Sequence, residues 1–315
     1  MKRIAIVAAS ALLLAGCAAT PAADEGDALP QVVASINVYG NIASAVGREH
    51  IELTNIITAV SQDPHSYEAS AQNRKSVDDA ALVILNGGGY DPFMDTLVEA
   101  SANDIAVIDA VEVSGLAPAE ADHAEGEEEH AEGEDEHDHI EGFNEHVWYS
   151  FPAMQSLANA IATELSEIDP ANADDYAANA AEFVGQVDGL QAEADRLAGY
   201  AEGRTVALTE PVPGYLIDAV GLTNVTPPAF TEAIEEGTDV PPQALQETLD
   251  LITSKSVLLL GYNEQTTSPE TERVLEAAED AEVRVVSFTE LLPDGLDYVS
   301  WMQRNNLAQL GEVIT

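Results

Sequence analysis

The sequence predicts an α/β fold with mainly parallel sheets, and three observations support this prediction. Short apolar runs rich in valine, isoleucine and leucine recur along the chain, and alanine-rich amphipathic stretches separate them. Such alternation is typical of parallel strands joined by crossover helices. The apolar runs also fall into two groups, with one long helical segment between them.

The apolar runs have the length and composition of buried strands. The first group comprises Gln31–Val38, Ile51–Ile57, Leu82–Leu85 and Ile105–Ile108. The second group comprises Thr205–Leu208, Val257–Leu260 and Val283–Phe288. With the long helical segment placed at 169–199, the two groups define an N-terminal unit over 31–168 and a C-terminal unit over 200–315.

The segment between the groups is the clearest helix in the sequence. Asp169 is a suitable N-cap and Pro170 suits the first turn, so we expect a helix over Pro170–Ala198. At 1.5 Å per residue this helix is about 43 Å long, which is enough to lie along two lobes. A long surface helix of a single domain fits the same pattern. One apolar stripe follows the helical repeat through Tyr176, Ala180, Phe183, Val187, Leu190, Ala194 and Leu197.

The N-terminal sequence indicates export. Two basic residues precede the apolar run Ile4–Ala15, which is too short to span a membrane but suits the core of a signal peptide. The stretch Leu14–Cys17 (LAGC) resembles the bacterial lipobox, so we expect a signal peptide over 1–17 and a lipid on Cys17. An ordinary signal peptide with a chance cysteine is the alternative. Residues 18–30 are small, polar and acidic, as in a flexible tether, which would hold the protein at the outer face of the cytoplasmic membrane, at the cell surface or in the periplasm.

The chain is strongly acidic, with a formal net charge of −46. Residues 119–141 contain 12 acidic and no basic residues, so most of this charge lies elsewhere in the chain. The charge argues against nucleic-acid binding and favours cations in a general way. Adaptation to a habitat such as a salty one is an alternative explanation. The chain has a single cysteine, which excludes a disulfide framework and a cysteine-ligated metal site.

Four of the seven histidines lie within 121–139, a segment that has no apolar side chain larger than alanine. Such a segment cannot form a core of its own, so we expect it to be solvated and to bind metal only weakly. It ends shortly before His146, so it is expected at the mouth of any site there and would serve as a metal-capture or sensing loop. An acidic loop with no metal role is the alternative. The histidines concerned are His123, His130, His137 and His139.

Four other residues stand where ligands collect in α/β proteins. His65 lies in a polar loop after a predicted strand, and His146 lies just ahead of an amphipathic helix. Glu210 and Glu290 end predicted strands of the second group. Ligands in open α/β sheets bind at the carboxyl ends of the strands. Two imidazoles and two carboxylates suit zinc, manganese or iron(II), although each residue taken singly could also be a packed histidine or a solvated glutamate.

Several motifs resemble the zinc/manganese solute-binding proteins of ABC importers, also known as the metal-binding lipoprotein family (cluster A-I). The resemblance extends from Gln31 to the C-terminus, with the lipobox in front and the histidine-rich insertion where zinc-binding members often carry one. The motifs are DPHSYE (63–68), EHVWYS (145–150), TEPVPGYLIDAVGL (209–222) and SFTELLPDGLDYVSWMQRNNL (287–307).

The resemblance implies two Rossmann-like α/β lobes bridged by one long rigid α-helix, with the metal held between the lobes. It implies that His65 and His146 are ligands. Glu210 matches a third ligand position, which is histidine in many zinc members and glutamate in manganese members. The fourth family ligand is usually aspartate, and the matching position here is Glu290, with Asp294 as a nearby rival.

The sequence departs from the family pattern around these positions. Asn144 and Glu145 precede His146 where the family commonly has Asp-Pro, and Ser150 lies where a downstream aspartate is common. The segment NGGGYDPFM (86–94) resembles a family turn, with Asp91 where glutamate is commoner. These departures leave the proposed ligands in place but change the hydrogen-bonding groups around them.

We therefore predict an extracytoplasmic lipoprotein that binds Zn2+, with Mn2+ or iron(II) as the alternative, and delivers it to the permease and ATPase of an ABC importer. We expect a monomer that binds no nucleic acid. A secreted metallohydrolase using the same ligands and a surface adhesin are the competing classes. The sequence has no H-E-x-x-H, no G-x-S-x-G and no phosphate-binding glycine loop, and four ligands argue for carriage since a catalytic zinc keeps one position open. We therefore expect no enzyme activity.

Overall fold

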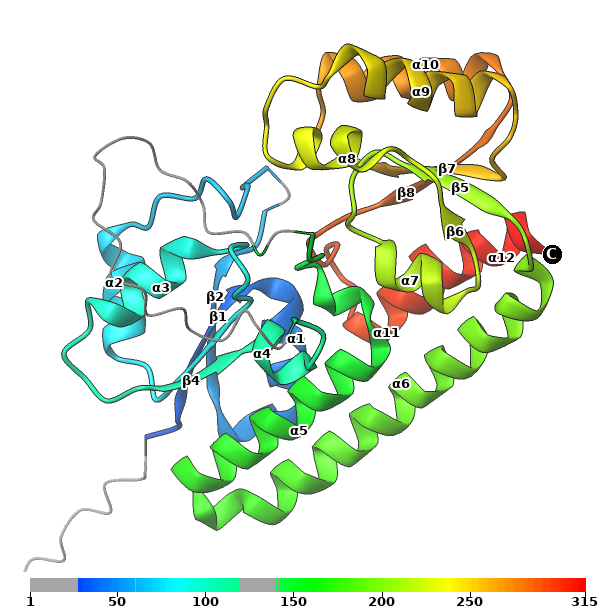
Figure 1. Ribbon diagram of the computed structural model, residues 1–315. Helices are drawn as coiled ribbons and strands as arrows, with labels where there is room; N and C mark the ends of the chain where they lie inside the picture. The colour runs from blue at the N-terminus through cyan, green and yellow to red at the C-terminus, as the bar shows by residue number, and fades with distance from the viewer. Residues whose placement is uncertain (1–27, 60, 119–139, 141) are drawn as a thin grey trace, which may run out of the picture.

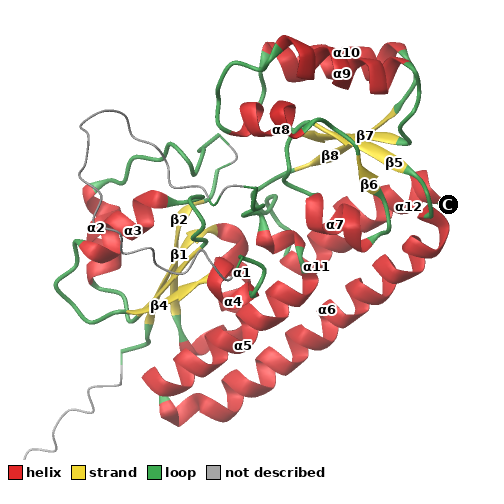
Figure 2. Cartoon of the chain, in the orientation of Figure 1, coloured by secondary structure: helices red, strands yellow, loops and turns green. Residues whose placement is uncertain are grey.

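The computed structural model describes residues 28–59, 61–118, 140 and 142–315. Two four-stranded parallel sheets lie in separate lobes, and one long helix runs along both lobes (Figures 1 and 2). This confirms the predicted α/β class and the predicted linking helix. Among the described residues, none of the helices combines the length and the apolar character needed to cross a membrane.

The N-terminal sheet has the strand order β2-β1-β3-β4, with every neighbouring pair parallel. Its strands are β1 (Gln31–Ile36), β2 (Glu52–Ile57), β3 (Leu82–Leu85) and β4 (Ala106–Asp109). The central strands β1 and β3 are almost continuously apolar because helices cover both faces of the sheet. The helices are α1 (Asn37–Gly47), α2 (Ala71–Asp78), α3 (Pro92–Glu99), α4 (Ala110–Ser114) and α5 (Phe151–Ile168), with 3-10 turns at Arg48–His50 and Val147–Tyr149.

The C-terminal sheet repeats this plan with the order β6-β5-β7-β8. Its strands are β5 (Thr205–Leu208), β6 (Thr223–Asn224), β7 (Leu259–Asn263) and β8 (Arg284–Phe288). The accompanying helices are α7 (Gly214–Ala219), α8 (Pro228–Glu235), α9 (Pro242–Thr253), α10 (Pro269–Asp280), α11 (Tyr298–Trp301) and α12 (Ala308–Ile314), with a π-helical turn at Met302–Leu307.

The linking helix α6 spans Ala173–Ala201 and follows a 3-10 turn at Pro170–Asn172. Every residue of the predicted apolar stripe is buried, because α6 packs against α1 and α5 of one lobe and against α7 and α12 of the other. Asp169 is the N-cap of this 3-10 turn, as predicted, but its side chain does not cap the turn. Its carboxylate accepts hydrogen bonds from the side chains of Asn172 (2.6 Å) and Tyr176 (2.8 Å), while the N-cap position of α6 itself is Asn172.

One hydrophobic core extends from the N-terminal sheet through α5 and α6 to the inner face of the C-terminal sheet. A second, smaller core lies between the other face of that sheet and helices α8, α9 and α10. Successive strand residues alternate between the two cores: Leu208 and Leu259 face the larger one, whereas Ala207 and Leu260 face the smaller one. The two lobes are therefore packed on a common core.

Two predicted strands have boundaries that were wrong by a few residues. The run from Gln31 ends as a strand at Ile36, and Val38 is instead buried on the first turn of α1. Strand β7 begins at Leu259 rather than at Val257 and continues to Asn263. An apolar run alone does not separate a strand from the buried start of the next helix.

Candidate metal-binding site

The carboxyl ends of strands from both sheets point toward the space between the lobes (Figure 1). His65 lies in the loop after β2, and His146 lies directly before the 3-10 turn that leads into α5. Glu210 follows β5, and Glu290 follows β8. The topology thus brings two imidazoles from one lobe toward two carboxylates from the other, at the strand ends where α/β proteins bind ligands.

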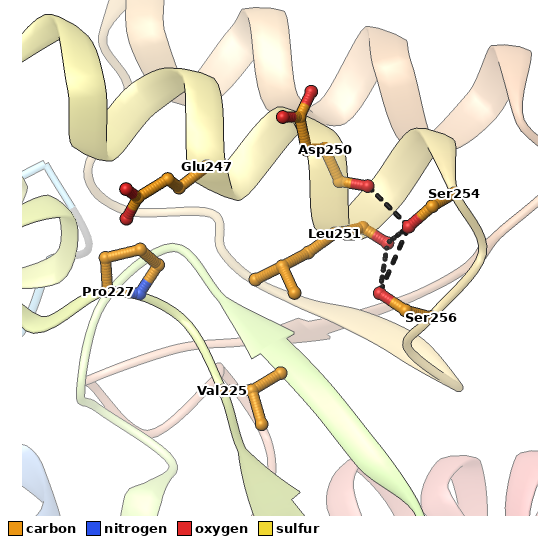
Figure 3. A pocket seen from close by; sticks show the side chains of 7 residues that line it. All are labelled: Val225, Pro227, Glu247, Asp250, Leu251, Ser254 and Ser256. Carbon is orange, nitrogen blue, oxygen red and sulfur yellow. Dashed lines mark hydrogen bonds between the residues drawn. The ribbon is translucent and has the colours of Figure 1, made fainter.

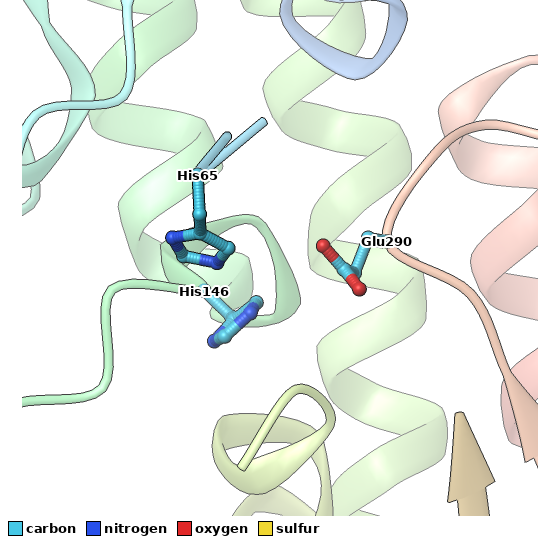
Figure 4. A group of neighbouring side chains, drawn as sticks. All are labelled: His65, His146 and Glu290. Carbon is cyan, nitrogen blue, oxygen red and sulfur yellow. The ribbon is translucent and has the colours of Figure 1, made fainter. Parts of the chain in front are cut away.

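His65, His146 and Glu290 converge in this space (Figure 4). Each offers one ligand atom, and the three atoms lie within 4.8 Å of one another. His146 and Glu290 are buried, and His65 is half-buried. Since a metal–ligand bond to nitrogen or oxygen is about 2.0–2.2 Å long, ligands of one ion can lie up to about 4.4 Å apart. The separation is therefore close to what one shared ion requires.

Glu210 lies beside Glu290, and Asn263 at the end of β7 joins them. The Asn263 side-chain amide donates to Glu210 Oε2 and to Glu290 Oε1 (2.7 Å). Glu210 Oε1 is buried without a hydrogen-bond partner among the described residues. The rival position Asp294 is exposed. Neither Asp294 nor Glu210 belongs to the potential metal-ligating groups found in the described part of the chain, so Glu210 is tied to them only through Asn263.

Burial and mutual repulsion disfavour negative charge on these carboxyls. Loss of solvation on burial, reinforced by the charge of Glu290, raises the pKa of Glu210 to about 8. Burial likewise raises the pKa of Glu290, although Asn263 and the Tyr90 hydroxyl donate hydrogen bonds to it and act in the opposite direction. A divalent cation between the two carboxylates would remove this penalty, because it supplies the missing positive charge.

Asn144 fixes the orientation of the His146 ring. Asn144 Oδ1 lies 2.8 Å from His146 Nδ1, so the proton on Nδ1 leaves Nε2 as the nitrogen able to bind metal. The Asn144 amide also donates to the carbonyl of Pro211 (2.9 Å), the residue after Glu210. The asparagine that departs from the family pattern therefore orients a proposed ligand and ties the two lobes together beside it.

The glycine-rich turn after β3 positions the aromatic wall of the site. Asp91 accepts hydrogen bonds from the backbone N–H groups of Asn86 (2.8 Å) and Gly87 (3.0 Å), and burial raises its pKa to about 6. Gly87 has a φ of 75°, and a side chain there would collide with the carboxyl of Asp109. The turn directs buried Tyr90 against the rings of His65 (4.9 Å between centroids) and His146 (5.6 Å).

The Asp63 side chain shapes the loop that carries His65. Its carboxylate accepts hydrogen bonds from the His65 backbone N–H (3.0 Å) and from the Ser66 hydroxyl (2.7 Å). This local turn, in which an aspartate bonds to the residue two positions on, holds the imidazole toward the other lobe (Figure 4).

Most of the chain matches one known protein family. The family described as ZnuA, zinc-uptake complex component A, periplasmic, matches residues 32–312. The chain belongs to this family. It is a substrate-binding protein of a metal ABC transporter and not an enzyme, which confirms the predicted family and the predicted absence of catalysis.

The names of similar proteins refer to different metals. The chain is 31% identical over 231 residues to the high-affinity zinc uptake system protein ZnuA of Paracoccus denitrificans, covering 68% of this chain and 71% of that protein. It is 26% identical over 233 residues to the manganese-binding lipoprotein MntA of Halalkalibacterium halodurans, covering 71% and 70%. The periplasmic zinc-binding protein TroA from Treponema pallidum has the same fold, with a TM-score of 0.71 at 18% identity over 91% of this chain and 100% of that one.

The structure adds acidic residues that the sequence did not single out as ligands. Glu145 and Glu235 form, with His65, a second group of potential ligands whose atoms lie within 4.8 Å of one another. Glu145 lies in a recognisable motif, but the sequence indicated only that it departs from the family pattern and not that it is a ligand. Glu235 ends an acidic helix, where nothing in the sequence separates it from its solvated neighbours.

The predicted lipidation site and the predicted capture loop lie outside the described residues. The roles of Cys17 and of His123, His130, His137 and His139 therefore stay predictions.

The C-terminal lobe also has an open surface pocket of about 350 Å3 near α9 (Figure 3). Its hydroxyls are already hydrogen-bonded, since Ser254 donates to Asp250 O and Ser256 donates to Leu251 O. None of the residues in the two metal-ligating groups lines this pocket, so it is not part of the site.

Proposed function

We propose that this member of the zinc-uptake component A family binds one Zn2+ between its lobes and delivers it to an ABC importer. His65, His146, Glu210 and Glu290 are the proposed ligands. The observation that carries the proposal is the convergence of His65 and His146 from one lobe with Glu290 from the other. Glu210 joins them through Asn263, and its unbonded oxygen gives it a free coordinating atom.

Zinc is supported by the affinity order of divalent metals and by the histidine-rich segment. A site of nitrogen and oxygen donors binds zinc more tightly than manganese unless geometry intervenes. Manganese or iron(II) is the second candidate, because two carboxylates with two imidazoles also suit these harder cations. The manganese-binding name of one relative supports the same alternative.

In this proposal each segment of the chain has a separate task. Residues 1–17 direct export, Cys17 carries the lipid, and residues 18–30 tether the protein outside the cytoplasmic membrane. The lobes over 31–168 and 200–315 hold the ion, the helix over 169–199 links them, and the permease and its ATPase receive the ion. The loop over 119–141 captures metal weakly at the mouth of the site.

Elemental analysis tests the proposal most simply. Protein purified from metal-replete medium should contain one tightly bound divalent ion per chain, and competition should favour zinc over manganese. A preparation that retains no ion after gel filtration, and binds none when titrated, would contradict the proposed function. A preference for manganese would keep the carrier role and replace the metal.

A further inference from the structure

An additional carboxylate reaches the proposed metal site from helix α8. Glu235 is the last residue of this helix, and its side chain is 13% exposed. Its Oε1 atom lies 3.5 Å from His146 Nε2, while the other ring nitrogen, Nδ1, lies 2.8 Å from Asn144 Oδ1. The same carboxylate belongs to the second ligand group, with His65 and Glu145.

The distance between Glu235 and His146 suits two ligands of one ion better than it suits a direct bond. Hydrogen bonds from nitrogen to oxygen are mostly 2.7–3.2 Å long. Two donors at about 2.1 Å from a common ion lie about 3.0 Å apart at right angles and about 3.4 Å apart at a tetrahedral angle. The observed 3.5 Å is therefore close to a shared-ion geometry.

The negative charges around Glu235 also favour a bound cation. In the described part of the chain, no lysine or arginine forms an ion pair with Glu235. Its side chain is only 13% exposed, and a ligand atom of Glu145, a second carboxylate, lies within 4.8 Å of one of its oxygens. A buried carboxylate among like charges is costly unless a positive charge joins it.

We propose that Glu235 is a direct ligand of the transported ion, in addition to the four ligands proposed above. This inference rests on the proposed function. With Glu235 the site offers three carboxylates and two imidazoles, so the ion takes more than four ligands, most of them oxygen. Manganese favours such an oxygen-rich, higher-coordinate shell more than zinc does. Glu235 therefore narrows the advantage of zinc over manganese without reversing the affinity order.

The test compares Glu235→Gln with Glu232→Gln in the full chain. Glu232 lies on the same helix and is exposed, so its substitution removes the same charge without touching the site. Zinc and manganese affinities are measured by chelator competition. We expect Glu235→Gln to weaken manganese binding by at least about tenfold and zinc binding by less than about threefold, because an amide oxygen is a poor donor to a hard cation. Glu232→Gln should leave both affinities unchanged.

Cobalt(II) absorption supplies a readout that a purely structural role of Glu235 would not change. Cobalt in the parent protein should show the weak visible bands of a five- or six-coordinate ion, and Glu235→Gln should shift them toward the intense bands of a tetrahedral ion. Glu235→Asp keeps the charge but withdraws the oxygen. It should also raise the zinc-to-manganese affinity ratio, and it serves as the second variant if Glu235→Gln does not fold.

The outcomes separate this inference from the proposed function. If the parent protein binds one tight ion while both Glu235 variants keep its zinc-to-manganese ratio and its cobalt spectrum, Glu235 is not a ligand and the carrier role stands. An equal loss of both metals with an unchanged cobalt spectrum would make Glu235 a positioning residue for His146, which also overturns the inference. If the parent binds no ion, the proposed function itself fails.

Discussion

Glu210→Gln gives the sharpest prediction about the site, because it removes an ionisable group and keeps its shape. The pKa of Glu210 is raised to about 8. At pH 7 the Glu210 carboxyl is therefore protonated in roughly nine-tenths of the metal-free protein molecules. A metal ion binds the carboxylate and must displace that proton. The apparent metal affinity therefore rises about tenfold for each unit by which the pH increases toward 8. Above about pH 8 the affinity no longer changes with this proton.

Glutamine has no proton to lose, so the ratio of parent to variant affinity isolates this effect. Protons on His65 and His146 compete equally in both proteins and cancel in the ratio. At pH 8 the parent should bind zinc at least about tenfold more tightly, since a neutral amide is the poorer ligand. The advantage should shrink by about tenfold per unit as the pH falls from 7.5 toward 6.

The assay is chelator competition for zinc in buffers from pH 6 to 8.5, with Glu264→Gln as the matched control. Glu264 is exposed and follows Asn263, so its substitution should leave the affinity unchanged at every pH. A parent-to-variant ratio that stays constant across the range would refute the reasoning. It would mean that Glu210 does not ionise when metal binds.

The same pKa predicts how the metal-free protein responds to pH. The folded state holds the Glu210 proton more tightly than the unfolded state, whose pKa is the ordinary 4.5. This contribution to stability is therefore complete below about 4.5 and is lost as the pH rises through about 8. Between pH about 4.5 and about 8, the melting temperature of the metal-free Glu210→Gln protein should fall less than that of the parent. Melting temperatures that fall in parallel would contradict the raised pKa.

Three further predictions concern the remaining ligands and the loop. His65→Ala should remove most of the zinc affinity. It should also lower the number of protons released on zinc binding between pH 5 and 7.5 by about one, because an ordinary imidazole titrates near 6.5. His50→Ala is the control, and an unchanged pH dependence of zinc affinity in His65→Ala would mean that His65 is not a ligand. Glu290→Gln should weaken zinc binding by at least about tenfold while Asp294→Asn leaves it intact, and the reverse result would transfer the ligand role to Asp294. Deletion of 119–141 should keep one tight site in calorimetry and lose only weak sites, so disappearance of the tight site would contradict the assigned role of the loop.

The fold was predictable because its signals are local and periodic. The apolar stripe of α6 follows the helical repeat, and both lobes bury it. Strand β6 was not predicted, since Thr223 and Asn224 are exposed and polar and pair with β5 only through the backbone. Apolar runs in the sequence therefore predict the buried strands. A short exposed edge strand forms through pairing with its neighbour, which the sequence does not show.

The candidate site was predictable only where its residues stand at strand ends or in recognisable motifs. His65, His146, Glu210 and Glu290 satisfy this condition. Glu235 does not, because it shares the end of α8 with exposed Glu232 and Glu236 and has the same sequence signal. Only the tertiary structure, which brings the Glu235 side chain to within 3.5 Å of His146 of the other lobe, distinguishes it from its solvated neighbours.

The central claim is that one ion lies between the lobes on these ligands, and an anomalous difference map at the zinc edge tests it most directly. Crystals of the protein loaded with one equivalent of zinc should give one strong peak, about 2.0–2.2 Å from the donor atoms of His65, His146, Glu210 and Glu290. A strong peak confined to residues 119–141, with no density between His65 and Glu290, would contradict the account.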